Sequence, residues 1–141
     1  MKNNVYVELL RNLLLSVKRF DREFIKENNL DISSTELNII QVIKASSKRT
    51  MTVIADKLAI TLGTFTISVN KLVEKGYLIK RKKDNDKRII ELELTNYSEE
   101  LLKKIDIFSN NVIERLLSNN EINSEDLESL GGILEKVNHH I

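Results

Sequence analysis

Apolar residues recur at spacings of three and four along most of the chain, and one short stretch changes to strict alternation. The first pattern places side chains on one helix face, whereas alternation is typical of a half-buried strand. The sequence predicts a helix over residues 4–27, a second ending near residue 45, a short third after residue 50 and a fourth after residue 61. Two more helices are predicted beyond residue 95, separated by the run SNNEIN.

Short polar residues mark where these helices begin. Ser33 and Glu36 have the spacing of a capping box, and Thr50, Thr61 and Asn123 stand directly before the third, fourth and last helices. Side-chain oxygens at such positions accept hydrogen bonds from N–H groups that the helix leaves unpaired. The short third helix, a tight turn and the fourth helix therefore predict a helix-turn-helix.

The stretch from residue 60 to residue 95 organises the chain. One face of its helix is apolar and comprises Leu62, Phe65, Val69, Leu72 and Gly76. The other face is small, polar or basic and shows Gly63, Thr64, Thr66, Ile67, Asn70 and Lys71. Alternation of apolar and acidic residues over 90–94 predicts a strand. The charged run KRKKDNDKR before it, residues 80–88, predicts the basic tip of a two-stranded hairpin.

The helices at the two ends of the sequence carry broad apolar stripes. The first contains Leu10, Leu13, Val17, Phe20 and Phe24, the fifth Leu101, Ile105, Phe108, Val112 and Leu116, and the sixth Leu127, Leu130, Leu134, Val137 and Ile141. These stripes exceed what one small domain can cover. We expect a mainly α fold with a small β-wing, in which residues 1–30 and 97–141 form a helical dimerisation layer and residues 31–96 form a winged helix-turn-helix. The alternative is a monomeric six-helix bundle.

Composition removes several classes of function. The 141 residues include no Cys, which excludes disulfides, thiol catalysis and cysteine-based zinc sites. The two histidines, His139 and His140, are adjacent and would point apart on a helix, so no metal site is expected. No phosphate loop or nucleophile elbow is present, and we expect neither a cofactor nor an enzymatic activity. The lack of a membrane-length apolar run and of a signal peptide predicts a cytoplasmic protein without a membrane partner.

Positive charge is concentrated in the middle of the sequence. Residues 44–88 contain 12 Lys and Arg against 4 Asp and Glu, a net charge of +8, whereas the whole chain carries +1. Such segregation creates the local positive field expected of a face that binds nucleic acid.

Together these features favour double-stranded DNA, since a helix fits the major groove and a basic hairpin reaches phosphates or the minor groove. Candidate helix contacts are Thr61, Gly63, Thr64, Thr66, Ile67, Asn70 and Lys71, and candidate hairpin contacts are Lys82, Lys83, Asn85, Asp86, Lys87 and Arg88. We expect Asn70 to contact adenine and Asp86 to hold Arg88 in position for the minor groove. For each feature alone, the alternative is an ordinary solvated surface.

The run from residue 50 to residue 95 resembles the winged helix of the MarR family of bacterial transcription regulators. The resemblance is carried by the Ala-x-x-Leu core of the short helix, the Leu-x-x-Lys-Gly turn and the wing signature: Ala55, Leu58, Leu72, Lys75, Gly76, Asp86, Arg88, Leu92, Leu94 and Thr95. The flanking helices fit the dimer domain of that family, so the resemblance covers nearly the whole chain. It implies a homodimer bound to a palindromic operator.

Within the family, ITLGTFTISVNKLVEKGYL is similar to the fatty-acid synthesis repressors of Gram-positive bacteria. That similarity implies control of fatty-acid synthesis genes, with long-chain acyl groups on acyl carrier protein as co-repressor. Two glycines common in the family are replaced by Ile89 and Ser98. The alternatives are a regulator of another operon that responds to a small aromatic or drug-like ligand, and a winged module for protein contacts. The sequence assigns no effector site, because its apolar residues serve equally as core.

Overall fold

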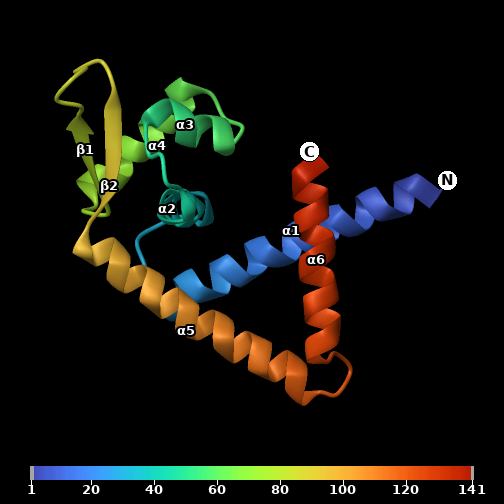
Figure 1. Ribbon diagram of the computed structural model, residues 1–141. Helices are drawn as coiled ribbons and strands as arrows, with labels where there is room; N and C mark the ends of the chain where they lie inside the picture. Colours follow the sequence, from blue (N-terminus) through green and yellow to red (C-terminus); the bar gives the residue numbers. More distant parts are fainter. Residues whose placement is uncertain (1, 141) are drawn as a thin grey trace. The chain divides into compact units, whose positions relative to one another are not determined.

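The computed structural model describes residues 2–140 of the chain, and side chains from residue 4 onward. The order of elements is α1 (Lys2–Glu27), α2 (Ser34–Ala45), α3 (Met51–Lys57), α4 (Leu62–Glu74), β1 (Leu78–Lys82), β2 (Ile90–Leu94), α5 (Asn96–Ser118) and α6 (Ser124–His140) (Figure 1). The predicted elements are present in the predicted order. The predicted contribution of Ile141 to the last stripe lies outside the described residues.

Contacts divide the chain into two compact units, residues 1–103 and residues 104–141. The first unit has a closed apolar core built mainly from α2, α3, α4 and the hairpin. Its fully buried side chains include Leu37, Ile40, Ile43, Ile54, Phe65, Val69, Leu72 and Leu92. The second unit contains most of α5 and all of α6, and no described residue of α6 is buried. The three-part functional division expected from the sequence stays a prediction.

The predicted caps are formed by side-chain oxygens. Ser33, Thr50 and Thr61 accept hydrogen bonds from the N–H groups of Glu36, Val53 and Thr64, at 3.1, 3.4 and 3.2 Å. Asn123 and Asp126 cap α6 reciprocally, with two bonds of 2.9 Å. Of the two hydrogen bonds in the predicted capping box of α2, only the one from the Glu36 N–H to Ser33 Oγ forms in the described structure. The Glu36 carboxylate accepts instead from Lys75 Nζ at 2.9 Å, which ties the start of α2 to the end of α4.

The hairpin is longer, and its tip shorter, than the charge pattern predicts. β1 pairs antiparallel with β2 in a register that joins Leu78 to Leu94 and Lys82 to Ile90. The basic strand β1 therefore includes the first three residues of the expected tip, and the loop spans residues 83–89. The strand continues through these basic residues because β2 supplies carboxylates on the same solvent-facing side. Glu93 pairs with Arg81, and Glu91 pairs with Lys83.

The α2–α3 connection extends this sheet by one bridge. Thr50 pairs with Glu91, and the Leu92 N–H donates to the Arg49 carbonyl at 2.8 Å. Because Thr50 also caps α3, the wing is anchored directly to the first helix of the helix-turn-helix.

Leu62 and the N-terminal half of α1 are more exposed to solvent than their places in the predicted apolar stripes indicate. Leu62 was expected on the buried face of α4 but is 48% exposed, because it lies in the first turn, beyond the core residue Phe65. In α1, Phe24 is buried, whereas Leu10, Leu13 and the other large apolar residues between positions 5 and 17 are exposed. The first part of the α1 stripe, Leu10, Leu13 and Val17, is therefore left uncovered within its own unit, whereas its last residue, Phe24, is packed in the core.

Within the described residues, no single helix is long and apolar enough to cross a membrane. The bent pair Met51–Lys57 and Leu62–Glu74 passes that test only by combined length and composition.

Candidate nucleic-acid interface

Helices α3 and α4 meet at a sharp bend that presents α4 outward. Their axes differ by 109°, within the range of a helix-turn-helix. In the connecting turn, Ala59 adopts a left-handed conformation with φ of 54°. The N–H groups of Ala59 and Ile60 donate back to carbonyls of α3 at 3.0 and 3.2 Å, which closes α3 before Thr61 begins α4.

Most predicted contact residues of α4 form one solvent-facing surface. Thr61, Gly63, Thr64, Ile67, Asn70 and Lys71 are exposed and Thr66 is half-buried, whereas Phe65, Val69 and Leu72 are buried on the opposite face. A side chain added at Gly63 would meet no described atom within 4 Å, so another molecule has room to approach the backbone there. A small polar surface of this kind suits close approach to a groove.

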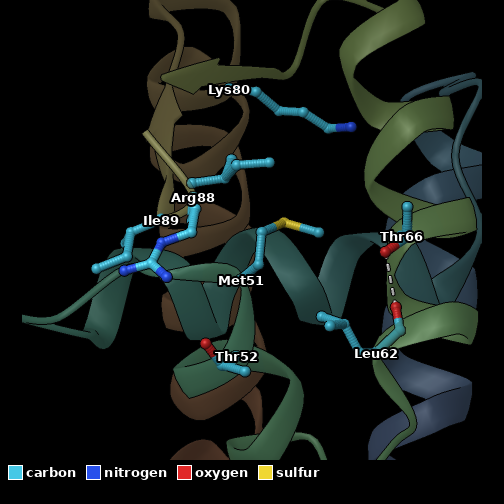
Figure 2. A pocket seen from close by; sticks show the side chains of 8 residues that line it. Met51, Thr52, Leu62, Thr66, Lys80, Arg88 and Ile89 are labelled. Atoms are coloured by element: carbon cyan, nitrogen blue, oxygen red, sulfur yellow. Dashed lines mark hydrogen bonds between the residues drawn. The ribbon is translucent and has the colours of Figure 1, made fainter. Parts of the chain in front are cut away.

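The hydroxyl groups on this surface differ in the hydrogen bonds they have left to make. Thr61 Oγ1 accepts from the Thr64 N–H and donates to Thr64 Oγ1 at 3.0 Å, so it is occupied by capping. Thr66 donates to the Leu62 carbonyl at 2.7 Å, a bond drawn in Figure 2. Thr66 therefore offers its methyl group and an oxygen lone pair, whereas Thr64 keeps a free hydroxyl proton.

At Asn70 the surface of α4 is joined to the wing. The Lys80 ammonium of β1 donates a hydrogen bond to Asn70 Oδ1. In Figure 2 the Lys80 side chain extends from the wing toward α4. Lys80 was not among the predicted contact residues. The alternation of β1 could have indicated it, because Lys80 pairs with the buried Leu92 and so points to the α4 side of the hairpin.

The predicted pair between Asp86 and Arg88 is present in the loop of the wing. Arg88 Nε and Nη2 donate to the two Asp86 carboxylate oxygens at 3.0 and 3.1 Å, and the Arg88 N–H adds a third bond of 3.1 Å. These bonds lower the pKa of Asp86, so the carboxylate stays ionised. The Arg88 side chain is nevertheless 90% exposed. A bidentate anchor thus fixes an accessible guanidinium.

The positive charge is less concentrated in space than along the sequence. Four basic residues of the segment 44–88 form ion pairs with carboxylates from outside it: Lys44–Glu99, Lys75–Glu36, Arg81–Glu93 and Lys83–Glu91, at 2.7, 2.9, 2.6 and 3.3 Å. Pairing therefore offsets half of the net +8 of that segment. Sequence position could not show this, because the partners come from α2, β2 and α5.

The two ion pairs that join the strands of the wing lie on one side of the hairpin. Arg81 and Lys83 bond to Glu93 and Glu91 there, whereas Lys80 and Lys82 belong to the α4 side. Among the predicted wing contacts, Lys83 is thus paired, and Asn85 and Lys87 are exposed in the loop. On the α4 side of the hairpin, Lys80 bonds to Asn70, and Lys82 forms no ion pair within the described residues.

A pocket of about 270 Å³ lies between the start of α3, α4 and the part of the wing next to its loop (Figure 2). Its lining combines apolar side chains with two hydroxyls and two cations: Met51, Leu62, Ile89, Ile90, Thr52, Thr66, Lys80 and Arg88. The exposed Leu62 is therefore a wall of this pocket. Ile89, which replaces a glycine common in the family, is another wall, so that replacement adds apolar surface here.

Ser98, the second residue that stands where the family commonly has glycine, lies at the junction between the wing and α5. Ser98 is buried, and its hydroxyl donates to the Tyr77 carbonyl. The Tyr77 ring stacks on Tyr97 with centroids 4.7 Å apart. Burial, followed by a hydrogen bond with Tyr97, raises the pKa of Tyr77. This cluster holds the base of the wing on the first turn of α5.

A bent helix pair with an exposed polar face, followed by a two-stranded wing, defines a winged helix-turn-helix protein. Residues 30–89, which contain α2, α3, α4 and β1, match the MarR family, and solved MarR-type transcriptional regulators share the fold of nearly the whole chain.

Three relatives illustrate the relationship. A MarR transcriptional regulator from Methanosarcina mazei Go1 shares the fold with a TM-score of 0.82 at 18% identity, over 97% of this chain and 96% of that one. Streptococcus pneumoniae FabT, solved in complex with DNA, has a TM-score of 0.72 at 25% identity, over 99% and 94%. The HTH-type transcriptional regulator TcaR of Staphylococcus aureus is 23% identical over 96% of this chain and 91% of its own length.

Proposed function

We propose that this chain is a homodimeric repressor that binds a palindromic operator, with α4 in the major groove and the wing at the adjacent minor groove. The observation that carries the proposal is the exposed polar surface of α4 beside an accessible arginine that Asp86 holds in place. FabT, a relative of similar fold, was solved in complex with DNA.

The exposed groups match what each groove presents. Ile67 and the methyl group of Thr66 suit thymine methyl groups, and Lys71 suits phosphate or guanine. Arg88 suits the minor groove of an A·T-rich flank, where the negative potential is strongest. Gly63 lets the backbone of α4 approach the DNA closely.

The exposed stripe of α1 supports the homodimer. Leu9, Leu10, Leu13, Leu14 and Val17 are solvent-exposed in the single chain, and Leu130 and Ile133 are exposed on α6. A large apolar surface of this kind is rarely left in water. Two-fold assembly would place two α4 helices on half-sites about one DNA turn apart.

Selection of DNA from a random library, followed by fluorescence anisotropy on the winning sequence, tests this proposal. We expect a palindromic consensus and binding at least about 1,000-fold tighter than to random DNA. Recovery of no consensus, with equal affinity for all sequences, would overturn it. The protein-contact alternative predicts that outcome, since a contact surface for protein has no need of base discrimination.

We further propose that the operon concerns fatty-acid synthesis and that long-chain acyl carrier protein is the co-repressor. The support is the similarity of residues 60–78 to such repressors, together with 25% identity to FabT over nearly the whole chain. In a gel-shift titration, the acylated carrier should tighten operator binding by roughly 5- to 150-fold over the unacylated carrier, the usual range of allosteric coupling. Equal binding with both carriers would exclude this effector.

The pocket beside α4 favours the second candidate, a small aromatic or drug-like effector. Its volume of about 270 Å³ is just below the usual range for ligand sites and suits a single ring better than a long acyl chain. An anionic ring there would meet Lys80 and Arg88 and would withdraw both from DNA. Release of operator by aromatic carboxylates, with no effect of acylated carrier, would decide for this candidate.

A further inference from the structure

The contact between Lys80 and Asn70 determines which hydrogen bonds Asn70 has left to make. An asparagine amide has one oxygen that accepts and one NH₂ group that donates, and the two can exchange places by rotation of the amide. A lysine ammonium only donates, so Lys80 can bond only to Oδ1. The amide is therefore held with its oxygen toward Lys80 of β1, which leaves the NH₂ group of this exposed residue free to donate to a ligand.

This orientation conflicts with the expectation that Asn70 reads adenine. An asparagine that pairs with adenine accepts from the adenine N6 amino group and donates to N7 at the same time. Here the accepting oxygen is bonded to a full positive charge, beside which a second, partly positive amino group is disfavoured. The Asn70 NH₂ group and the remaining N–H bonds of Lys80 together form a surface of donors.

We propose that Lys80 is a positioning residue that makes Asn70 specific for guanine. Guanine presents two acceptors in the major groove, N7 and O6, whereas adenine and cytosine each present an amino donor there. A pair of adjacent donors matches the two acceptors of guanine and is repelled by the amino groups of adenine and cytosine. The inference rests on the proposed DNA binding by α4, and it names what one position of that surface recognises.

A structural role alone would make a different prediction. If the contact only braces the wing against α4, its loss would weaken binding to all sequences alike. If Lys80 orients the amide, its loss frees Oδ1 and changes which base is preferred. Base preference at one position therefore separates the two roles, whereas overall affinity does not.

The experiment measures anisotropy on the selected operator and on variants with each base at every position of a half-site. Asn70→Ala identifies the base pair that Asn70 reads, as the one whose preference disappears. At that pair we expect the wild type to favour guanine over adenine by roughly 5- to 150-fold, the discrimination typical of a bidentate contact.

Lys80→Met removes the donor but keeps the apolar stem, and it should shift the preference at that pair toward adenine by at least about tenfold. Lys82→Met is the matched control. It removes the same charge from the same side of β1, two residues further along and without a contact to Asn70 in the described structure, and it should retain guanine. Lys80→Arg keeps a donor and should also retain guanine. Circular dichroism checks that each variant is folded.

Three results would overturn the proposal: a wild-type preference for adenine at that pair, an unchanged preference in Lys80→Met, or no base preference lost in Asn70→Ala. Failure of the proposed function is distinguishable, because the wild type would then select no consensus at all.

Discussion

At the scale of single residues, a side chain on the surface of α4 or the wing is defined by the bonds it already makes. Thr61 and Thr66 stand on the same helix with similar side chains, yet the first is occupied by capping and the second keeps only acceptor capacity. The sequence predicted Thr66 on the outward face by periodicity, and Thr61 both as the cap of the fourth helix and as a DNA contact. It could not show which hydroxyl stays available to a ligand, because that depends on hydrogen bonds within one turn.

The wing arginine yields the first prediction. Arg88→Ala should weaken binding to all operators and reduce the slope of log affinity against log salt by roughly one, because one cationic contact is lost. Fluorescence anisotropy across a salt series measures both quantities. Unchanged affinity and slope would mean that Arg88 is only a solvated partner of Asp86.

The second prediction concerns Asp86, for which two effects have opposite signs. Removal of an exposed negative charge should strengthen DNA binding if only net charge matters. If the carboxylate positions Arg88, Asp86→Ala should weaken binding despite the gain in positive charge. Asp84→Ala, which removes a charge from the same loop, is the control and should strengthen binding slightly. Tighter binding in both variants would exclude a positioning role.

The third prediction concerns Tyr77 and alkaline pH. The pKa of the folded phenol is raised, so above about pH 10 the unfolded chain loses this proton while the folded chain keeps it. The free energy of unfolding should therefore fall as pH rises from about 10, by up to about 1.4 kcal/mol per pH unit from this group. Urea unfolding of Tyr77→Phe should show a smaller fall, whereas the exposed Tyr6→Phe should match the wild type. Equal slopes in all three would contradict the assignment.

At the scale of elements, the sequence was sufficient where the pattern is local. Each predicted cap is in place, since a hydroxyl or amide before an apolar-periodic run determines the helix start by itself. The tip of the wing was predicted too long, because strand pairing depends on carboxylates of β2 that follow later in the chain, Glu93 for Arg81 and Glu91 for Lys83. The pocket and the Lys80–Asn70 contact were missed for the same reason: both form only when the hairpin folds beside α4.

The cap of α4 provides the fourth prediction. Thr61→Ala should lower the free energy of unfolding by about 1 kcal/mol, because two N-terminal bonds of the helix are lost. Thr61→Ser keeps the oxygen and should be nearly as stable as the wild type. Because the Thr61 hydroxyl is occupied by capping, we expect Thr61→Ala to keep the base preferences of the wild type. Any loss of operator affinity should be the same for every operator variant. A preference lost at one base pair would show instead that Thr61 contacts DNA directly.

At the scale of the whole molecule, the question is what covers the apolar stripes outside the winged domain. The sequence indicated that these stripes exceed what the domain can cover, and the exposed residues of α1 agree with that reasoning. The sequence could not identify what covers the stripe, because a helix of the same chain and a helix of a second copy could bury the same apolar residues equally well.

The fifth prediction distinguishes these partners. Leu13 is 38% exposed in the single chain, and Leu134 on α6 is only partly covered, so neither glutamate substitution should unfold its own unit. Leu13→Glu combined with Leu134→Glu should give monomers in sedimentation velocity, because a dimer would bury both charges in an apolar interface. Lys18→Gln with Lys136→Gln changes the net charge by the same two units on polar faces, and should remain dimeric. Monomers should also bind the operator more weakly, since each would engage one half-site. A persistent dimer in the leucine variant would place the interface elsewhere on the chain.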